Sequence, residues 1–524
     1  MLLEARNIKL YIGDRLLIDI ERLHINRNER IGLVGRNGSG KTTLLQTLAG
    51  KMAPDEGKVT TDTTCELLPQ LKRRKTARSS GEVTQEYIRQ ALSKNPGILL
   101  LDEPTTHLDT NHIEWLEKKL FHWPGAFVVV SHDRAFLDAL CTTIWEIHEG
   151  HVRTYAGNYT EYVKQKEIER QQQRLAYEKY VHKKKQLEEA LRLKEKKAQR
   201  ATKTPKQTSA SEAKLTGAKP YFAKKQKKLQ QTAKAIKTRL DKLEKVEKMK
   251  EEPPIKMNLP ETDTLRGRIV LRAIDVPGTI GERTLWERIS FEVRSGDKLA
   301  VMGPNGSGKT TLVKKIIRRE DGISVSPAVK MGYFSQDLGL LDTAKSILDN
   351  VRETSKQDET IMRTVLARLQ FFRDDVYKPI HVLSGGERVK AALAKVFLSD
   401  INMLILDEPT NFLDIPAVEA LESLLKHYAG TVIFVTHDRR FAQNIANRIL
   451  IFQNGQIDLF EGTYEQYERH QRETKNDRAK EEQKFLLDTK ISEVLSRLSI
   501  DPSEELEEEL EKLLAQKKKL DASN

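Results

Sequence analysis

Two glycine-rich stretches of this 524-residue sequence have the residue types and spacing of a phosphate-binding loop: residues 35–42 read G-R-N-G-S-G-K-T and residues 303–310 read G-P-N-G-S-G-K-T. Such glycines let the backbone wrap around a phosphate, and amides at the start of a helix point at the anion. The lysine would reach the β- and γ-phosphates of a nucleotide, and the threonine after it would bind Mg²⁺. The candidate phosphate-binding residues are Gly35, Asn37, Gly38, Ser39, Gly40, Lys41, Thr42, Thr43, Gly303, Asn305, Gly306, Ser307, Gly308, Lys309, Thr310 and Thr311.

Downstream of each loop, an apolar run ends in the pair Asp-Glu. Such runs predict buried parallel strands, whose carboxyl ends would bring the two carboxylates to the edge of the sheet beside the phosphates. Asp102 and Asp407 would hold Mg²⁺ through water, and Glu103 and Glu408 would orient or deprotonate the attacking water. The sequence therefore predicts hydrolysis of ATP with Mg²⁺ as the metal.

A histidine follows a further apolar run in each half of the chain. His132 and His437 lie thirty residues after Asp102 and Asp407. A single histidine after a strand is more often a structural residue than a catalytic one. Because this histidine recurs at the same spacing, we predict that both contact the γ-phosphate.

The two halves are copies of one domain. The glycine-rich loop recurs at an offset of 268 residues, and three later blocks recur at an offset of 305, namely residues 99–105, 131–134 and 157–162. Gln70 aligns with Gln336 at an offset of 266, so 39 residues that precede block 384–387 in the second copy are missing from the first. The first copy is therefore predicted to lack most of one subdomain.

These blocks resemble the motifs of the ATP-binding cassette superfamily. Residues 384–387, which read S-G-G-E, are similar to its signature motif, and residues 79–82 are similar to a degenerate form of it. In that superfamily two cassettes face each other head to tail, and each ATP is held by one P-loop and the opposite signature. The resemblance implies that Lys41 shares an ATP with residues 384–387, and Lys309 with residues 79–82.

The same resemblance adds site residues. Gln70 and Gln336 are similar to the Q-loop glutamines, and Asp109 and Asp414 lie in sequences similar to the D-loops. The signature residues added to the ATP sites are Ser79, Gly81, Glu82, Ser384, Gly385, Gly386 and Glu387. The metal-binding candidates are then Thr42, Gln70, Asp102, Thr310, Gln336 and Asp407.

The sequences of the two predicted ATP sites differ in two respects. Ser80 replaces the first glycine of the signature in the first copy. Tyr11 precedes the first P-loop as a candidate for stacking on adenine, whereas the equivalent residues 276–279 of the second copy have no aromatic side chain. We expect both sites to bind ATP and to hydrolyse it at unequal rates.

The positive charge of the chain is concentrated in one segment. The net charge is +13, but residues 161–250 contain 28 Lys and Arg against 11 Asp and Glu, a net charge of +17. Helical patterns over residues 162–200 and 224–250, separated by residues 201–222 with Pro, Gly and Ser, predict an antiparallel hairpin. The candidate contact residues at its tip, near residues 201–223, are Lys203, Lys206, Lys214, Leu215, Lys219, Tyr221 and Phe222.

Such a hairpin could be a solvated spacer or could bind a polyanion. The excess charge favours RNA, because Lys and Arg contact phosphates and the apolar tip residues can pack on bases. A membrane surface is disfavoured because the helices lack a continuous apolar face. The longest apolar runs, such as residues 127–130, are too short to span a bilayer, and the first residues lack a signal-peptide core. With only Cys65 and Cys141 as cysteines, a cytoplasmic protein is expected.

Tandem cassettes joined by a basic hairpin resemble the ABC-F family, and the missing arm with the extended tip resembles its antibiotic-resistance branch, of the Vga type. The resemblance implies binding to the ribosome at 23S rRNA of the E-site region, with P-site tRNA as a further candidate contact and no role for membrane or DNA. It also implies displacement of lincosamides, pleuromutilins and streptogramin A. A general translation factor that acts on stalled ribosomes is the first alternative, and the ATPase subunit of a transporter is the second.

The predicted fold class is α/β, with two tandem P-loop ATP-binding cassettes, a long helical hairpin between them and a helical C-terminal extension. The chain is expected to be a monomer whose two cassettes pair with each other. The C-terminal extension is expected either to contact the ribosome or to pack on the chain. The expected domains are residues 1–160, 161–255, 256–470 and 471–524.

Overall fold

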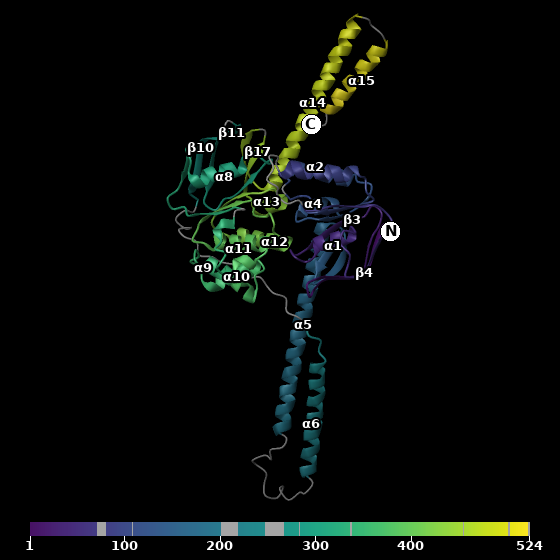
Figure 1. Cartoon of the computed structure of the whole chain (residues 1–524), viewed down its shortest axis with the longest axis vertical. Coiled ribbons are helices and arrows are strands. Elements are labelled where there is room, and N and C mark those ends of the chain that lie inside the picture. The colour runs from purple at the N-terminus through teal and green to yellow at the C-terminus, as the bar shows by residue number, and fades with distance from the viewer. Residues whose placement is uncertain are drawn as a thin grey trace. The chain divides into compact units, whose positions relative to one another are not determined.

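A computed structural model (Figure 1) provides the coordinates. It describes residues 1–70, 80–106, 108–200, 218–246, 267–281, 283–335, 338–453, 455–500 and 504–521. The chain separates into two units: one contains Met1–Tyr155 and Pro254–Asn524, and the other contains Ala156–Pro253.

A six-stranded sheet with the order β5-β6-β7-β3-β8-β9 forms the centre of the first cassette. Its strands β5, β6, β7 and β3 are parallel. Every residue of β6 and β7 is buried, as expected for the central strands of a parallel sheet covered on both faces. The bounds are β3 Arg30–Gly35, β5 Cys65–Leu68, β6 Ile98–Asp102, β7 Ala126–Val130, β8 Thr143–His148 and β9 His151–Ala156.

A smaller antiparallel sheet with the order β2-β1-β4 packs into the same apolar core. Its strands are β1 Leu3–Ile12, β2 Arg15–Ile25 and β4 Glu56–Thr61. The helices of the first cassette are α1 Lys41–Leu48, α2 Ser80–Ser93, α3 Thr110–Phe121 and α4 Arg134–Leu140. The strands and helices that the sequence placed around the first P-loop are therefore present.

The second cassette repeats this plan. Its six-stranded sheet has the order β14-β15-β16-β12-β17-β18, and its three-stranded sheet the order β11-β10-β13. The strands are β10 Ile269–Ile280, β11 Arg283–Arg294, β12 Lys298–Met302, β13 Ile323–Val325, β14 Met331–Phe334, β15 Met403–Asp407, β16 Thr431–Val435, β17 Arg448–Gln453 and β18 Gln456–Glu461. The helices that have counterparts in the first cassette are α8 Lys309–Arg318, α11 Gly385–Leu398, α12 Ile415–His427 and α13 Arg439–Ile445.

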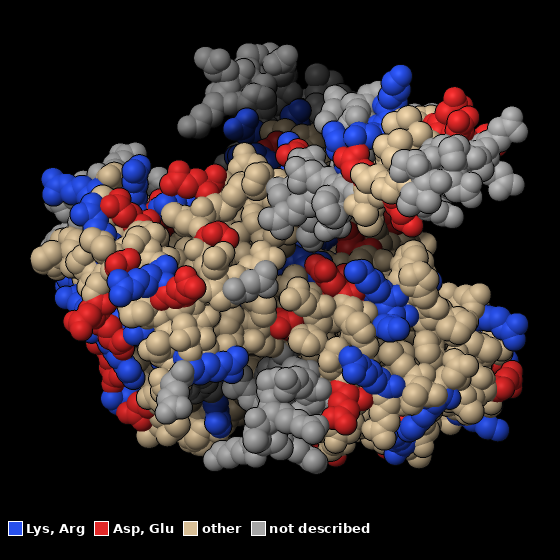
Figure 2. Space-filling model, turned by 90° about the horizontal axis from the view of Figure 1, so that it is seen from above, with Lys and Arg blue, Asp and Glu red and all other residues tan. Residues whose placement is uncertain are grey.

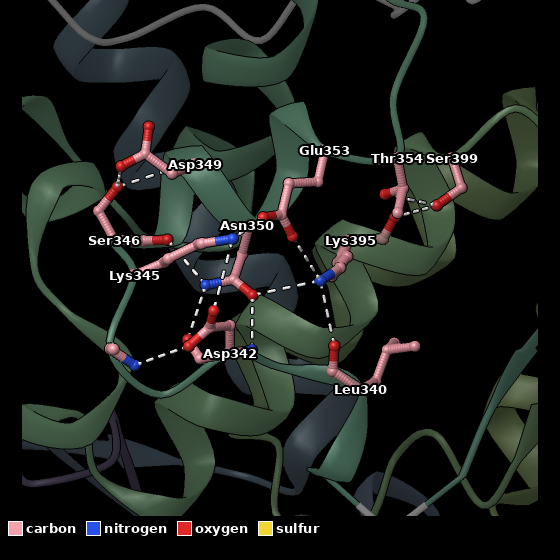
Figure 3. A network of polar contacts seen from close by, with 11 residues as sticks. Leu340, Asp342, Lys345, Ser346, Asp349, Asn350, Glu353, Thr354, Lys395 and Ser399 are labelled. Carbon is pink, nitrogen blue, oxygen red and sulfur yellow. Dashed lines mark hydrogen bonds and ion pairs between the residues drawn. The ribbon is translucent and has the colours of Figure 1, made fainter.

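The residues that the first cassette lacks form a helical subdomain in the second. It contains η2 Leu338–Leu340, α9 Ile347–Arg352, α10 Glu359–Arg368, η3 Arg373–Tyr377 and η4 Ile380–Val382, all between β14 and α11. Figure 3 shows how it is tied to α11. The buried Lys395 of α11 donates to the carbonyl of Leu340 (3.1 Å) and to Asn350 Oδ1 (3.2 Å), and it lies 3.5 Å from Glu353.

Replacing Lys395 by methionine is expected to lower the free energy of unfolding by about 2 kcal/mol, because the Leu340 carbonyl loses a buried donor. Thermal unfolding of the purified protein measures the change. Lys345→Met provides the control, since Lys345 is half exposed and its partners Asp342 and Glu353 face solvent. A transition shifted equally by both variants would contradict this role for Lys395.

The second unit is an antiparallel pair of helices (Figure 1), α5 Tyr159–Arg200 and α6 Ala218–Asp241. The predicted hairpin is thus present, but two boundaries were wrong. Helix α6 begins at Ala218, so Pro220 lies in its first turn. A proline is tolerated there because it costs no backbone hydrogen bond. It ends at Asp241 and does not extend through residues 242–246, which form a turn and an irregular segment.

The predicted helical C-terminal extension consists of two helices that contact each other, α14 Tyr464–Ile500 and α15 Glu504–Asp521. Its first helix begins before residue 471 and continues without a break from the end of the second cassette. Within the described ranges, no helix is both long enough and apolar enough to span a lipid bilayer.

Candidate functional site

Each P-loop connects a buried strand to a helix. The loop after β3 leads into α1, and the loop after β12 leads into α8. Gly40 and Gly308 precede the helices with φ values of 98° and 101°, a left-handed conformation that favours glycine. A Cβ on Gly308 would lie 2.4 Å from Trp286 Cζ3, so this loop has no room for a side chain. The backbone amides at the helix start are thereby held in the conformation of an anion-binding loop.

The two P-loop lysines are buried and bind their own loops. Lys41 Nζ donates to the carbonyls of Gly35 (2.8 Å) and Arg36 (3.0 Å), and Lys309 Nζ donates to those of Gly303 (2.9 Å) and Pro304 (2.8 Å). Burial lowers the pKa of both lysines, although neighbouring carboxylates oppose the shift. The side-chain nitrogen of each lysine thus lies within its own P-loop, where a phosphate would bind.

A threonine hydroxyl and an aspartate lie together beside each loop. Thr310 Oγ1 donates to Asp407 Oδ1 at 3.3 Å, and Thr42 pairs with Asp102 in the same way. Burial raises the pKa of both aspartates, and the threonine hydrogen bonds oppose the shift. A hydroxyl next to a carboxylate is an oxygen ligand set that suits Mg²⁺. These four residues therefore fit the metal that the sequence predicted.

The glutamates that follow these aspartates adopt an unusual backbone conformation. Glu103 and Glu408 both have φ of 51°, a strained value for a residue with a side chain. Burial raises the pKa of Glu103 to about 8 and that of Glu408 to about 7. Glu103 Oε1 lies 3.2 Å from His132 Nε2, and Glu408 Oε1 lies 3.3 Å from His437 Nε2. Each predicted base is therefore adjacent to its predicted histidine.

Both histidines are buried, and burial lowers their pKa to about 3, so they are neutral at pH 7. Several buried polar atoms of these histidines, of Glu103 and of the two P-loop serines have no hydrogen-bond partner among the described residues. These atoms are Ser39 Oγ, Ser307 Oγ, Glu103 Oε1, His132 Nδ1, His437 Nδ1 and His437 Nε2. Because buried polar atoms normally have partners, this set is consistent with a site that receives a polar ligand.

Each P-loop contacts the opposite cassette. The amide of Asn37 donates to Asp414 Oδ2 at 3.0 Å, and its Nδ2 donates to the Phe412 carbonyl at 3.2 Å. A Cβ on the signature residue Gly386 would lie 3.1 Å from Asn37 Nδ2. At the other P-loop, the amide of Asn305 donates to Asp109 Oδ2 at 2.9 Å. The P-loop of each cassette thus meets the D-loop of the other, as the head-to-tail prediction requires.

The sequence reasoning did not identify the ionic contacts between the cassettes. Arg134, which follows His132 and Asp133, donates from both terminal nitrogens to the two carboxylate oxygens of Glu422 in α12, and one of these bonds is 3.2 Å long. The equivalent Arg439 lies 3.7 Å from Glu117 in α3. The 305-residue offset relates Arg134 to Arg439 and Glu117 to Glu422, and a comparison of the two copies could have revealed this symmetry.

Other predicted residues are not placed in the sites. Tyr11 and Gln70 are exposed, and their proposed contacts with adenine and Mg²⁺ remain predictions. The side chains of Ser384 and Glu387 bond to each other at the start of α11 and form its capping box. Gly81, Glu82, Lys219, Tyr221 and Phe222 lie in helices whose side chains there are not described. The residues outside the described ranges are Ser79, Lys203, Lys206, Lys214, Leu215 and Gln336.

Comparison with known families agrees with this geometry. A family model described as "ABC transporter" matches residues 19–86 and 286–411, and a second model of that description matches residues 145–216. The chain is 31% identical to the ribosome protection protein VmlR of Bacillus subtilis, over 94% of this chain and 92% of that protein. It is 34% identical to the erythromycin resistance ATP-binding protein MsrA of Staphylococcus epidermidis, over 83% of this chain and 94% of that protein.

Solved structures support the fold. A structure of RNase-L Inhibitor superposes with a TM-score of 0.57 at 17% identity, covering 87% of this chain and 90% of that chain. A complex that contains an archaeal ribosome recycling factor superposes with the same TM-score of 0.57. At this identity the likeness concerns the tandem-cassette fold alone.

Proposed function

We propose that this chain, which belongs to the ABC-F family of ATP-binding cassette proteins, is an ATP-dependent ribosome-protection factor of the cytoplasm. Its hairpin would enter the E-site region of the ribosome, contact 23S rRNA and P-site tRNA, and displace drugs from the peptidyl-transferase centre. The proposed drugs are lincosamides, pleuromutilins and streptogramin A. The similarity to a ribosome protection protein and an erythromycin resistance protein supports this assignment.

The chain is an ATPase, as its two cassettes and its relatives imply. Thr42 with Asp102, and Thr310 with Asp407, would hold Mg²⁺, which would neutralise phosphate charge. In each site the glutamate would orient the attacking water, and the neutral histidine beside it would donate a hydrogen bond to the γ-phosphate. ATP binding would close the cassettes and hold the hairpin in its ribosome-bound position, and hydrolysis would release it.

The observation that carries the ribosomal assignment is the charge of the hairpin. Its described ion pairs, such as Lys184 with Glu188 and Lys166 with Glu169, lie within α5, and the side chains of Lys184 and Glu188 are about half exposed. With 28 Lys and Arg against 11 Asp and Glu, residues 161–250 have far more cations than anions. Figure 2 shows that Lys and Arg are interspersed with Asp and Glu on the cassette face in view. Outside residues 161–250 the chain has 61 Lys and Arg against 65 Asp and Glu, so the charge balance favours the hairpin as the element that would bind a polyanion.

Ribosome association is tested with the Glu103→Gln, Glu408→Gln variant, in which ATP would not be hydrolysed. We expect this variant to sediment with ribosomes in the presence of ATP, and the bound fraction to fall as salt rises. The single-site variants Glu103→Gln and Glu408→Gln serve as matched controls. A variant that stays in the supernatant at low salt would exclude both ribosomal functions and would favour the transporter subunit.

Drug susceptibility separates ribosome protection from a general role in translation. Expression in a susceptible strain is expected to raise the inhibitory concentration of at least one of the proposed drug classes. The Glu103→Gln, Glu408→Gln variant is the control for a requirement for ATP hydrolysis. Unchanged susceptibility to all three classes, with ribosome binding intact, would favour the general translation factor.

A further inference from the structure

The two D-loop aspartates hold the opposite P-loops through equivalent hydrogen bonds, but they have different cationic partners. Asp414 accepts from the amide of Asn37 through Oδ2, while its Oδ1 lies 3.1 Å from the ammonium of Lys390. Asp109 accepts from the amide of Asn305 through Oδ2, while its Oδ1 lies 2.6 Å from Nδ1 of His112. The first aspartate is paired with a lysine of α11, and the second with a histidine of α3.

The offset of 305 residues shows that the two partners stand at different positions of the two cassettes. Gln85 of the first cassette aligns with Lys390, so the first cassette has no cation at that position of α2. Ala417 of the second cassette aligns with His112, so the second cassette has no titratable group at that position of α12. Each cassette therefore supplies one partner for its own D-loop aspartate. In the first cassette this partner comes from α3, and in the second it comes from α11.

The subdomain that the first cassette lacks gives a physical reason for this difference between the two cassettes. Lys390 is buried, and besides Asp414 it binds Gln370 Oε1 at 2.8 Å. Gln370 lies in the helical subdomain that the first cassette lacks. A buried lysine without such a second partner would be costly. His112, whose side chain is 30% exposed, reaches its aspartate from the other side without needing that subdomain.

We propose that His112 is a positioning residue of the second ATP site, where it holds Asp109 against the P-loop amide of Asn305 as Lys390 holds Asp414 at the first site. This inference rests on the ATP sites assigned above.

The surroundings of the pair agree with such a role. Burial opposes ionisation of Asp109, but its hydrogen bonds with Asn305 and His112 outweigh burial and lower its pKa. Lys309 and His437 interact electrostatically with Asp109, and Arg439 donates to the carbonyl of Thr110 next to it. Arg439 in turn pairs with Glu114 and Glu117 of α3. His437 is neutral at pH 7, because burial lowers its pKa to about 3.

The test measures release of labelled ATP from the Glu103→Gln, Glu408→Gln variant after a chase with unlabelled ATP. Two release phases are expected, one for each site. Adding His112→Ala is expected to accelerate by about fivefold the phase that Lys309→Ala abolishes, and to leave the other phase unchanged. Adding Lys390→Met is expected to accelerate the phase that Lys41→Ala abolishes. His112→Ala accelerating both phases equally, or neither, would overturn the inference.

The conservative variant His112→Asn is a rescue test, because its amide nitrogen can donate to Asp109 as Nδ1 does. The second-site phase of this variant is expected to stay close to that of the parent variant. His112→Asn accelerating this phase as much as His112→Ala would overturn the role of the hydrogen bond from His112. If the parent variant binds no ATP, the ATP-site assignment itself fails; if it binds ATP at both sites and ignores His112, only this inference fails.

Discussion

Replacing both Glu103 and Glu408 by glutamine is expected to lower the rate of ATP hydrolysis by on the order of 10³-fold, because glutamine cannot accept the proton of the attacking water. Both carboxylates are buried and lie beside a histidine at the end of a strand, so no water-exposed group can replace them readily. Phosphate release by the purified protein measures the rate. Glu287→Gln on the exposed side of β11 is the control and should retain full activity.

The single variants are expected to differ from each other. Glu103→Gln leaves only the site of Lys309, which we propose shares its ATP with the degenerate signature containing Ser80, and should therefore lose more activity than Glu408→Gln. A Cβ at the aligned Gly385 would meet no described atom within 4 Å. The Cβ of a serine at this position would thus not clash with the described part of the chain. Equal turnover of the two single variants would contradict unequal sites.

Replacing Arg134 by alanine is expected to lower the free energy of unfolding by about 3 kcal/mol. Arg134 and Glu422 are 5% and 8% exposed, and Asp438 lies 3.8 Å from the same guanidinium. Burial raises the pKa of Asp438 to about 6, and the charge of Arg134 opposes the shift. Without the arginine, two buried carboxylates lose their cation. Thermal unfolding measures the loss of stability.

Two further variants separate this effect from a simple loss of side-chain volume. Arg440→Ala removes an ion pair with Asp138 whose side chains are 26% and 29% exposed, and it should have a much smaller effect. Arg134→Met combined with Glu422→Leu should recover most of the loss, because an apolar pair leaves no buried charge between these positions. A double variant as unstable as Arg134→Ala would contradict the electrostatic explanation.

The local elements around the sites could be predicted from the sequence because each is specified by neighbouring residues. The apolar runs before Asp102 and Asp407 became β6 and β15, and the glycine-rich loops became the starts of α1 and α8. The sequence predicts the hairpin but not the start of α6, because Pro220 within residues 201–222 favours a break between the two helices. In the first turn of a helix, proline removes an amide that has no helical partner.

The contacts between the cassettes could not be predicted in this way. Asp109 and Asn305 are 196 residues apart, and Arg134 and Glu422 are 288 residues apart. No local pattern specifies such pairs, since each side chain is chosen for a partner that only the assembled chain supplies. The positive φ of Glu103 and Glu408 could not be predicted from a local pattern either. This backbone conformation is locally unfavourable, so the surrounding packing must hold it.

The sequence by itself determined that this protein has two P-loop cassettes, that the first lacks 39 residues, and that one basic segment separates them. Only the tertiary structure decided that each P-loop is held by an aspartate of the other cassette, and that Lys390 and His112 serve these aspartates from different helices. The physical reason is that motifs bind phosphate through local backbone geometry, whereas pairing of the two sites depends on charges brought together by folding.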